Sequence, residues 1–210
     1  EGMSKNFRFM VVQVTKQLES TLRLLDEPDP RLIKAVRDSD DYIDTLKSQI
    51  ENDCYEFLGQ QRVQDERLVD AVRALNVVTS NLERIADFSV NVGRQLRRLR
   101  VPAALHRFAY RPALEHVLTG VGLISDALFE RDSSRALQIC QVEDRIDRLY
   151  GADLEKIMDG LRASRDVEDL VTCMFILHYL ERMGDALLNI GEAILFAVLG
   201  ERLKFHQYRV

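Results

Sequence analysis

Apolar side chains recur every three or four residues along nearly the whole chain, which is the spacing of amphipathic α-helices. The first such stripe starts at Phe7, with Ser4 as its predicted N-cap, and runs to Leu25. No stretch of useful length alternates apolar and polar residues as a half-buried strand does. The pattern therefore predicts an all-α protein with helices over residues 7–25, 31–60, 66–100, 112–130, 139–161 and 166–199.

Prolines and a glycine separate these predicted helices. Segment 26–30 contains two prolines and ends the first helix, and Gly200 follows the last one. Segment 100–112 is the strongest internal boundary, because each of its prolines disfavours helix in the residue before it. Three helices precede this boundary and three follow it. The chain is therefore predicted to form two tandem three-helix bundles, a first repeat at residues 1–104 and a second at 105–210.

The two halves also resemble one another residue by residue. Segment 82–93 aligns without gaps on segment 180–191, and six of the twelve positions are identical. Upstream, segment 40–46 matches segment 143–149. Tandem duplication of one three-helix unit explains this agreement better than chance does.

Each repeat carries two pairs of acidic residues spaced four positions apart. Residues at this spacing lie on one helix face, one turn apart, so two like charges weaken an isolated helix by roughly 0.2–0.5 kcal/mol. One pair would be ordinary among 34 acidic residues, but four pairs at equivalent positions call for a reason. The pairs are Asp40 with Asp44, Glu83 with Asp87, Glu143 with Asp147, and Glu181 with Asp185.

If the second and third helices of a repeat are antiparallel neighbours, its four carboxylates converge on one surface. Converging carboxylates raise one another's pKa or require a cation. Hard oxygen ligands suit Mg²⁺, Ca²⁺, Mn²⁺ and iron, and zinc also accepts them. Asn91 and Asn189 extend two of the acidic stripes by one turn. The competing interpretation is a solvated acidic face balanced by Arg84, Arg145 and Arg182, but four matched pairs favour metal.

The acidic motifs resemble those of the PhoU family, whose repeats each carry Glu/Asp-x-x-x-Asp twice, one copy within Leu-Glu-Arg-Ile-Gly-Asp. Here that copy is found at residues 82–87 and 180–185, and the resemblance extends from Phe7 to Leu199. Ala86 departs from the family pattern, in which glycine is usual at this position. The resemblance implies two three-helix bundles with metal on the eight acids, as multinuclear iron or with zinc, manganese or magnesium. It also implies a cytoplasmic regulator of phosphate uptake and phosphate-starvation signalling, with a phosphate transporter and its sensor kinase as partners.

Composition narrows the classes of function. With 29 Lys and Arg against 34 Asp and Glu, the net charge is −5, which does not provide the basic face of a nucleic-acid-binding protein. The three cysteines are far apart and form no CxxC pair, which indicates a reduced, cytosolic protein without a thiolate zinc site. His178 lies in an apolar stretch and is interpreted as a packed residue, and its position three residues before Glu181 keeps a ligand role open as the lesser alternative. No glycine-rich phosphate loop or nucleophile motif occurs, so no catalytic residues are predicted.

The sequence thus predicts a non-enzymatic, metal-binding regulator that docks on a membrane transporter or kinase. No apolar run approaches the ~18 residues that a membrane span needs. The arginine-rich segment 94–100, the bend at 101–112 and the metal faces are the candidate docking surfaces. Peripheral membrane association and a homodimer are further options. Two other functions stay open: a metal-dependent hydrolase, in which clustered cations activate water, and a helical adaptor that binds a basic partner without metal.

Overall fold

The protein is all-α, as the sequence predicts. A computed structural model describes residues 2–60, 66–163 and 166–200, and within these ranges every regular element is helical. The long helices are α1 (Gly2–Asp26), α2 (Pro30–Gln60), α3 (Glu66–Leu96), α4 (Tyr110–Phe129), α5 (Ser133–Arg162) and α6 (Val167–Leu199), and the 3₁₀ helix η1 (Pro102–Arg107) lies between α3 and α4.

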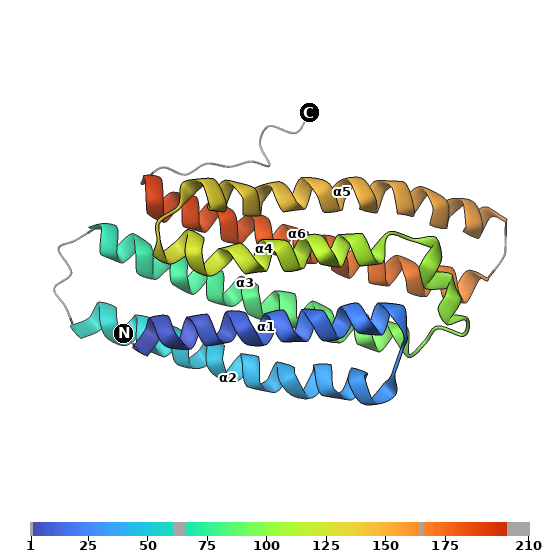
Figure 1. Cartoon of the computed structure of the whole chain (residues 1–210), viewed down its shortest axis with the longest axis horizontal. Helices are drawn as coiled ribbons and strands as arrows, with labels where there is room; N and C mark the ends of the chain where they lie inside the picture. Colours follow the sequence, from blue (N-terminus) through green and yellow to red (C-terminus); the bar gives the residue numbers. More distant parts are fainter. Residues whose placement is uncertain (1, 61–65, 164–165, 201–210) are drawn as a thin grey trace.

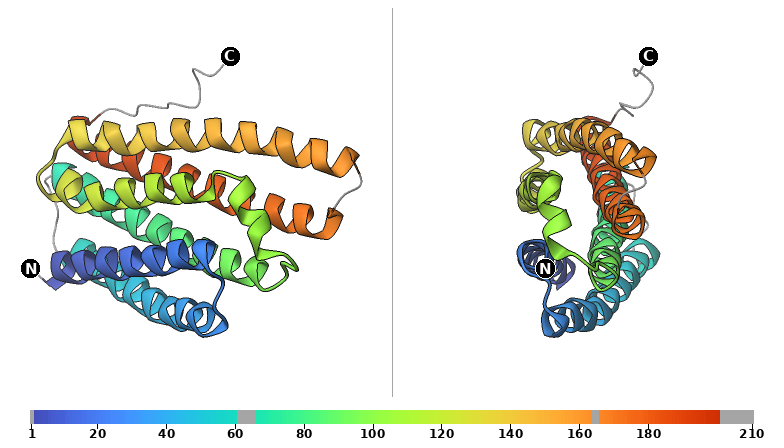
Figure 2. Two further views of the ribbon diagram at one scale, coloured as in Figure 1. Left: turned by 45° about the vertical axis from the view of Figure 1, so that its right-hand side comes forward. Right: turned by 90° about the vertical axis from the view of Figure 1, so that its right-hand side faces the viewer.

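The six long helices run roughly parallel or antiparallel to one another along the length of the molecule (Figure 1). Helices α2, α3, α6 and α5 lie side by side in that order and form a curved layer, and α1 and α4 pack together on one side of it (Figure 2). The first repeat contributes α1–α3 and the second α4–α6. Helices α3 and α6 meet in the middle of the layer, so the repeats join along these two helices.

Burial follows the apolar stripes of the sequence. In α1 the fully buried side chains include those of Phe7, Met10, Val14 and Leu18, spaced by three or four residues. Helix α6 buries side chains over more of its circumference because it contacts α3, α4 and α5 at once. The buried apolar side chains of both repeats form one continuous core. Burial of this area is the main stabilising contribution, at roughly 25 cal/mol per Å² of apolar surface.

Most helix ends agree with the predicted boundaries to within two residues, but α5 begins at Ser133, six residues before the predicted start at 139. Helix α1 begins at Gly2, so Ser4 lies inside it and is not its N-cap. Helix α3 ends at Leu96 instead of near residue 100, and the proline-flanked bend forms η1, which the sequence pattern did not indicate. The predicted division at residues 104/105 falls inside this 3₁₀ helix. Most of the polar turn expected at 61–66 lies outside the described residues.

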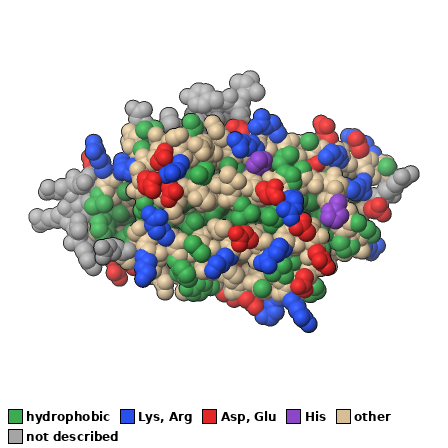
Figure 3. All heavy atoms as spheres, in the orientation of Figure 1, with side chains coloured by type: hydrophobic (Ala, Val, Ile, Leu, Met, Phe, Trp, Pro, Cys, Tyr) green, Lys and Arg blue, Asp and Glu red, His purple; other side chains and the backbone are tan. Residues whose placement is uncertain are grey.

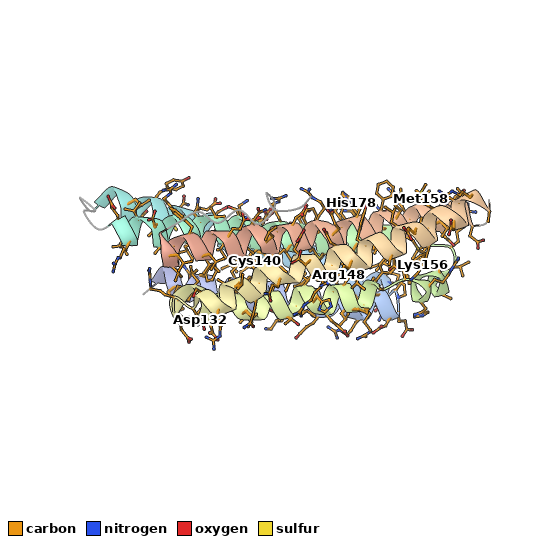
Figure 4. The ribbon with its side chains drawn as sticks, turned by 90° about the horizontal axis from the view of Figure 1, so that it is seen from above. Asp132, Cys140, Arg148, Lys156, Met158 and His178 are labelled. Carbon is orange, nitrogen blue, oxygen red and sulfur yellow. The ribbon has the colours of Figure 1, made fainter. Side chains whose placement is uncertain are left out.

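Several of the described helix ends carry recognisable caps. The Asp132 side chain accepts hydrogen bonds from the backbone N–H groups of Ser134 and Arg135, and so caps the start of α5 (Figure 4). At the end of α6, Gly200 has a φ of +77°, the left-handed conformation in which glycine commonly ends a helix. The predicted end of the last helix at Gly200 is thereby confirmed.

Buried carboxylates hold the connection between the two repeats. Asp169 on α6 accepts hydrogen bonds from the backbone N–H groups of Arg100 and Val101, at 2.9 and 3.1 Å. Asp153 on α5, which is 1% exposed, accepts from the backbone N–H of Ala109 at 2.5 Å. The chain between α3 and α4 is therefore fastened to the second repeat at both ends.

The surface is mixed in charge. On the face shown in Figure 3, acidic and basic side chains are interspersed and separated by apolar ones, without a broad field of one sign. Across the described ranges, no helix combines the length and the hydropathy that crossing a bilayer requires.

Candidate functional site

The first acid cluster comprises Asp40 and Asp44 on α2 and Glu83 and Asp87 on α3, two helices in contact. Asp40, Glu83 and Asp87 are half-buried, whereas Asp44 is exposed. The pKa of Asp40 is raised to about 6, mainly by burial and also by the negative charges of the other three carboxylates. The structure thus brings Asp44, Glu83 and Asp87 close enough to Asp40 to disfavour its ionisation.

Lys47, which belongs to none of the acidic motifs, lies at the first cluster. Lys47 lies three residues after Asp44 on α2, and its Nζ is 3.4 Å from Glu83 Oε2. Burial raises the pKa of Glu83, the charge of Lys47 opposes this shift, and Asp44 and Asp87 add to it. The first cluster therefore contains an ammonium group among its carboxylates.

The second acid cluster comprises Glu143 and Asp147 on α5 and Glu181 and Asp185 on α6. Glu143 is buried and the other three are half-buried. The pKa of Glu181 is raised to about 7, mainly by burial, then by Asp185, with smaller contributions from Asp147 and Glu143. Arg182 opposes this shift, and its Nη1 lies 3.3 Å from Asp185 Oδ2. Of the arginines expected to balance the acids, Arg182 does so here.

One oxygen in each cluster is shielded from solvent and makes no hydrogen bond: Asp40 Oδ1, and Glu181 Oε2, which lies 3.5 Å from His178 Nδ1. Such atoms are costly to leave unpaired, and a cation would satisfy them. Within residues 2–60, 66–163 and 166–200, no three Asp, Glu, His or Cys side chains are already arranged as a ligand shell. The carboxylate donor set fits a hard cation, but side-chain rotation is needed to close the shell. Metal ligation by these eight acids stays a prediction.

Gln17 on α1 lies beneath the first cluster and was not predicted as part of any site. Its Nε2 donates hydrogen bonds to the backbone oxygens of Val36 on α2 and Ala86 on α3, each at 3.2 Å. Its amide also lies close enough to Asp40 to oppose the rise of that carboxyl's pKa. This single amide therefore joins all three helices of the first repeat. The sequence signal was a polar residue within the apolar stripe of α1.

His178 is exposed rather than packed, contrary to the sequence-based interpretation. It lies on α6 (Figure 4), one turn before Glu181. Its Nδ1 is 3.5 Å from Glu181 Oε2. Cys173, Ile176, Leu177 and Leu180 of this stretch are buried, whereas Phe175 and His178 are exposed on the face of α6 that remains open.

The two clusters lie at the same level along the antiparallel helices α3 and α6. Three contacts set this register: Arg73 over the ring of Phe196, Asn189 with Asn81, and Phe88 with Tyr179. Residue numbers rise on α3 as they fall on α6, which places the turn 83–87 opposite the turn 181–185. Asn91, one turn beyond Asp87, donates a hydrogen bond to that carboxylate at 3.3 Å.

Two repeats of three helices, joined along their third helices and each carrying paired acids on its second and third, define a duplicated helical-bundle protein. The family model described as "PhoU domain" matches residues 7–96 and 112–194. The chain therefore belongs to the PhoU domain family.

Curated relatives and solved structures agree with this assignment. The phosphate-specific transport system accessory protein PhoU homolog of Clostridium acetobutylicum is 25% identical over 193 residues, covering 90% of this chain and 87% of the relative. The homolog of the same name from Caulobacter vibrioides is 28% identical over 192 residues, covering 89% and 82%.

Among solved structures, PhoU from Pseudomonas aeruginosa superposes with a TM-score of 0.84 at 23% identity, covering 96% of this chain and 97% of that one. The phosphate transport system regulatory protein PhoU from Streptococcus pneumoniae has a TM-score of 0.86 at 21% identity, and 97% of each chain is covered. At these identities the structures show that the fold is shared.

Proposed function

We propose that this protein is a cytoplasmic accessory regulator of phosphate uptake that acts by binding components of a phosphate transporter. Family membership and relatives that are named as accessory proteins of phosphate-specific transport systems support this role. The proposed partners are the transporter and a sensor kinase of phosphate-starvation signalling. Homodimerisation and peripheral association with the membrane are part of the same proposal.

We further propose that the two acid clusters bind metal, with multinuclear iron first and zinc, manganese or magnesium as alternatives. The observation that carries this proposal is the same in both repeats: four carboxylates come from two neighbouring helices, and one of them, Asp40 or Glu181, has a raised pKa and a buried oxygen that accepts no hydrogen bond. In the first cluster Asp40 and Asp44 would hold the metal with Glu83 and Asp87. In the second cluster Glu143 and Asp147 would hold it with Glu181 and Asp185.

Bound cations would neutralise the negative charge of the clustered carboxylates. An empty cluster of four ionised carboxylates carries about −4, and cations that bridge them cancel most of it. Carboxylates from α2 and α3, or from α5 and α6, would then be held together instead of repelling one another. The protein's own contribution is to position the acids on two packed helices and to set the charge of the docking face.

We propose a regulatory role rather than catalysis. A hydrolase needs a substrate pocket beside the metal. A cavity of about 220 Å³ in the described part of the chain lies between η1 and the start of α6, where neither acid cluster contributes to its lining. Its lining residues are Val101, Ala103, Ala104, Arg107, Asp166, Asp169 and Leu170. Protein loaded with iron, manganese or magnesium should not hydrolyse small phosphate esters. Turnover that disappears in the Glu83→Gln variant would make the hydrolase the better assignment.

Two measurements test the proposal. Elemental analysis of protein purified without a metal-affinity column should find metal that the double variant Asp87→Asn, Asp185→Asn loses while keeping its helical circular dichroism. Membranes that contain a phosphate transporter should co-sediment the protein more strongly with metal than with chelator. Equal co-sedimentation in both conditions would show that docking does not depend on bound metal. No co-sedimentation in either condition would reject the transporter as partner.

A further inference from the structure

Helix α1 presents to solvent a stripe of side chains in which cations outnumber acids. Its buried side chains face the core, and the exposed ones recur every three or four residues along the opposite side of the helix, over about 27 Å. Four of these seven exposed side chains are cations and one is acidic, although the whole chain has a net charge of −5. The members of this α1 stripe are Lys5, Arg8, Phe9, Val12, Lys16, Glu19 and Arg23.

The four cations of the α1 stripe make no ion pair within the described ranges. Arg8 lies over the ring of Phe129, 4.6 Å from its centroid, and Arg23 donates a hydrogen bond to Ser20. A guanidinium over an aromatic ring or beside a hydroxyl keeps its positive charge. The cations of the stripe are therefore available to attract an anionic surface.

Exposed apolar side chains lie in the middle of the same surface. Phe9 is 42% exposed, and Val12, one turn further along α1, is 46% exposed. Tyr42 on α2, which is 45% exposed, contacts Phe9 edge to face, with ring centroids 6.0 Å apart. Lys5 precedes this apolar group by one turn of α1 and Lys16 follows it by one turn, so cations border it at both ends. Helices that bind in the headgroup region of a bilayer combine apolar and basic side chains in this way.

The first acid cluster does not face the same way as the α1 stripe. Gln17 lies on the inner side of α1, is 2% exposed, and donates hydrogen bonds to α2 and α3 beneath that cluster. Helix α1 therefore lies between its own exposed stripe and those carboxylates, and a helix is about 10 Å across, which equals the Debye length at about 0.1 M salt. Nearer acids are partly neutralised, since Asp38 pairs with Lys34 and Asp26 with Arg111.

We propose that the α1 stripe is a docking surface for a membrane that contains anionic phospholipid, with α1 lying in the plane of the interface. This inference rests on the proposed peripheral association with the membrane, for which it names the surface and the lipid chemistry. Phe9, Val12 and Tyr42 enter the boundary between headgroups and acyl chains, and the four cations contact headgroup phosphates. An acidic protein segment would also attract the cations, but it gives no reason for the three exposed apolar side chains between them.

Helices α1 and α4 pack on one side of the curved layer formed by the other four helices (Figure 2). A membrane bound along α1 therefore lies on that side of the molecule. The acids of the first cluster, on α2 and α3, remain accessible to metal and to a protein partner.

Sedimentation with protein-free vesicles tests the proposal, in chelator so that the result does not depend on metal. The unmodified chain should bind mixed phosphatidylglycerol–phosphatidylcholine vesicles and should bind vesicles of phosphatidylcholine alone about tenfold more weakly or less. Binding to the mixed vesicles should fall as salt is added, because salt screens the attraction between the cations and the headgroups.

Variants of the α1 stripe test its charge and its apolar side chains separately. Each cation near an anionic leaflet strengthens binding by about fivefold, so removing three of them should weaken binding to the mixed vesicles by about a hundredfold. The triple variant is Lys5→Gln, Lys16→Gln, Arg23→Gln. Val12→Gln keeps the charge of the stripe and should weaken binding several-fold, because it removes an apolar side chain from the interface.

A matched control separates the α1 stripe from the net charge of the protein. The variant Arg94→Gln, Arg97→Gln, Arg98→Gln also removes three exposed cations, but from the end of α3 and the residues just after it. It should bind the mixed vesicles as the unmodified chain does. An equal loss in this control and in the α1 variant would show that net charge, and not the stripe, determines binding. Circular dichroism confirms that each variant is folded.

The outcomes distinguish this surface from the function on which it rests. If neither the unmodified chain nor the α1 triple variant binds the mixed vesicles, or if both bind equally, the inference is wrong, and co-sedimentation with transporter-containing membranes still tests the proposed function. If the triple variant loses binding only to membranes that contain the transporter, the stripe recognises an acidic protein segment and the lipid proposal is wrong. Stripe-dependent binding to protein-free vesicles, with no gain when the transporter is present, would support the stripe and reject the transporter as partner.

Discussion

Phe88 on α3 stacks on Tyr179 on α6, with ring centroids 6.2 Å apart and ring planes at 27°. Phe88 follows Asp87 directly, and Tyr179 lies two residues before Glu181. The contact thus joins the two sequence repeats beside both acid clusters. Because the buried core is also continuous across this junction, the repeats are expected to unfold together rather than as separate domains.

A double-mutant cycle of Phe88→Ala and Tyr179→Ala should give a coupling energy of about 0.5–1.5 kcal/mol, the range of aromatic pairs. Urea unfolding of the four proteins measures it. The control is the Phe9–Tyr42 pair between α1 and α2, where both rings are more than 40% exposed and a smaller coupling is expected. Additive effects at Phe88 and Tyr179 would show that the stack does not stabilise the junction.

Gly191→Ala should lower the free energy of unfolding by about 1–3 kcal/mol or more, because α5 and α6 pack too closely for a methyl group. A Cβ at residue 191 would lie 2.4 Å from Cys140 Sγ and 3.0 Å from the backbone oxygen of Ala136. The matched control is Gly122→Ala in α4, where nothing lies within 4 Å of the added Cβ. That change should stabilise the protein by about 0.5–1 kcal/mol. Chemical denaturation that ranked the two variants in the opposite order would contradict this packing.

Asp169→Asn should destabilise the protein by about 1–3 kcal/mol, because an amide replaces a buried carboxylate that accepts two backbone hydrogen bonds. Its neighbour Glu168 also contacts the linker, through an ion pair with Arg100, but both side chains are exposed. Glu168→Gln should therefore change stability by less than about 0.5 kcal/mol. Thermal unfolding of the two variants at neutral pH checks the difference, and equal losses would mean that burial of Asp169 is not what matters.

The acid clusters should make the metal-free protein less stable as pH rises from about 4.5 to 7. The pKa values of Asp40 and Glu181 are raised to about 6 and about 7, so across this window the folded protein binds more protons than the unfolded chain. The free energy of unfolding then falls with rising pH. After allowance for solvent screening, each group should contribute about 1–2 kcal/mol.

Urea unfolding in chelator at pH 5 and pH 8 measures this effect. The double variant Asp40→Asn, Glu181→Gln should lose part of the pH dependence and be more stable than the unmodified chain at pH 8. Divalent metal should stabilise the unmodified chain at pH 8 and the double variant less. A double variant with an undiminished pH dependence would place the titrating groups elsewhere.

The helices were predictable because their apolar stripes are long and regular, and Gly200 ends the last one through its left-handed conformation. The 3₁₀ turn at Pro102–Arg107 was not predictable, since prolines mark a break without specifying the conformation that follows. Ser4 had the side chain of an N-cap, but α1 extends beyond it to Gly2. Local sequence propensity therefore predicts that a helix exists more reliably than it predicts the residue at which the helix begins or ends.

The acid clusters could be anticipated from the matched spacing of the two repeats, but their other members could not. Lys47 belongs to no motif, and its contact with Glu83 depends on how α2 is rotated against α3. Gln17 reaches Val36 and Ala86 only because three helices converge at one level. His178 faces outward because the packing of α6 against α3, α4 and α5 leaves that side of the helix open. Such contacts follow from the packing of helices rather than from the sequence of any one of them.

Chains built from two similar repeats carry a specific hazard: a repeat of one copy can take the place of its equivalent in another, so that molecules become entangled through an opened connector. Here the connector is fastened by Asp169 at Arg100 and Val101 and by Asp153 at Ala109, and both carboxylates belong to the second repeat. Opening it would strip two buried carboxylates of their donors before any exchange could begin. The linker thereby favours pairing of each first repeat with the second repeat of its own chain.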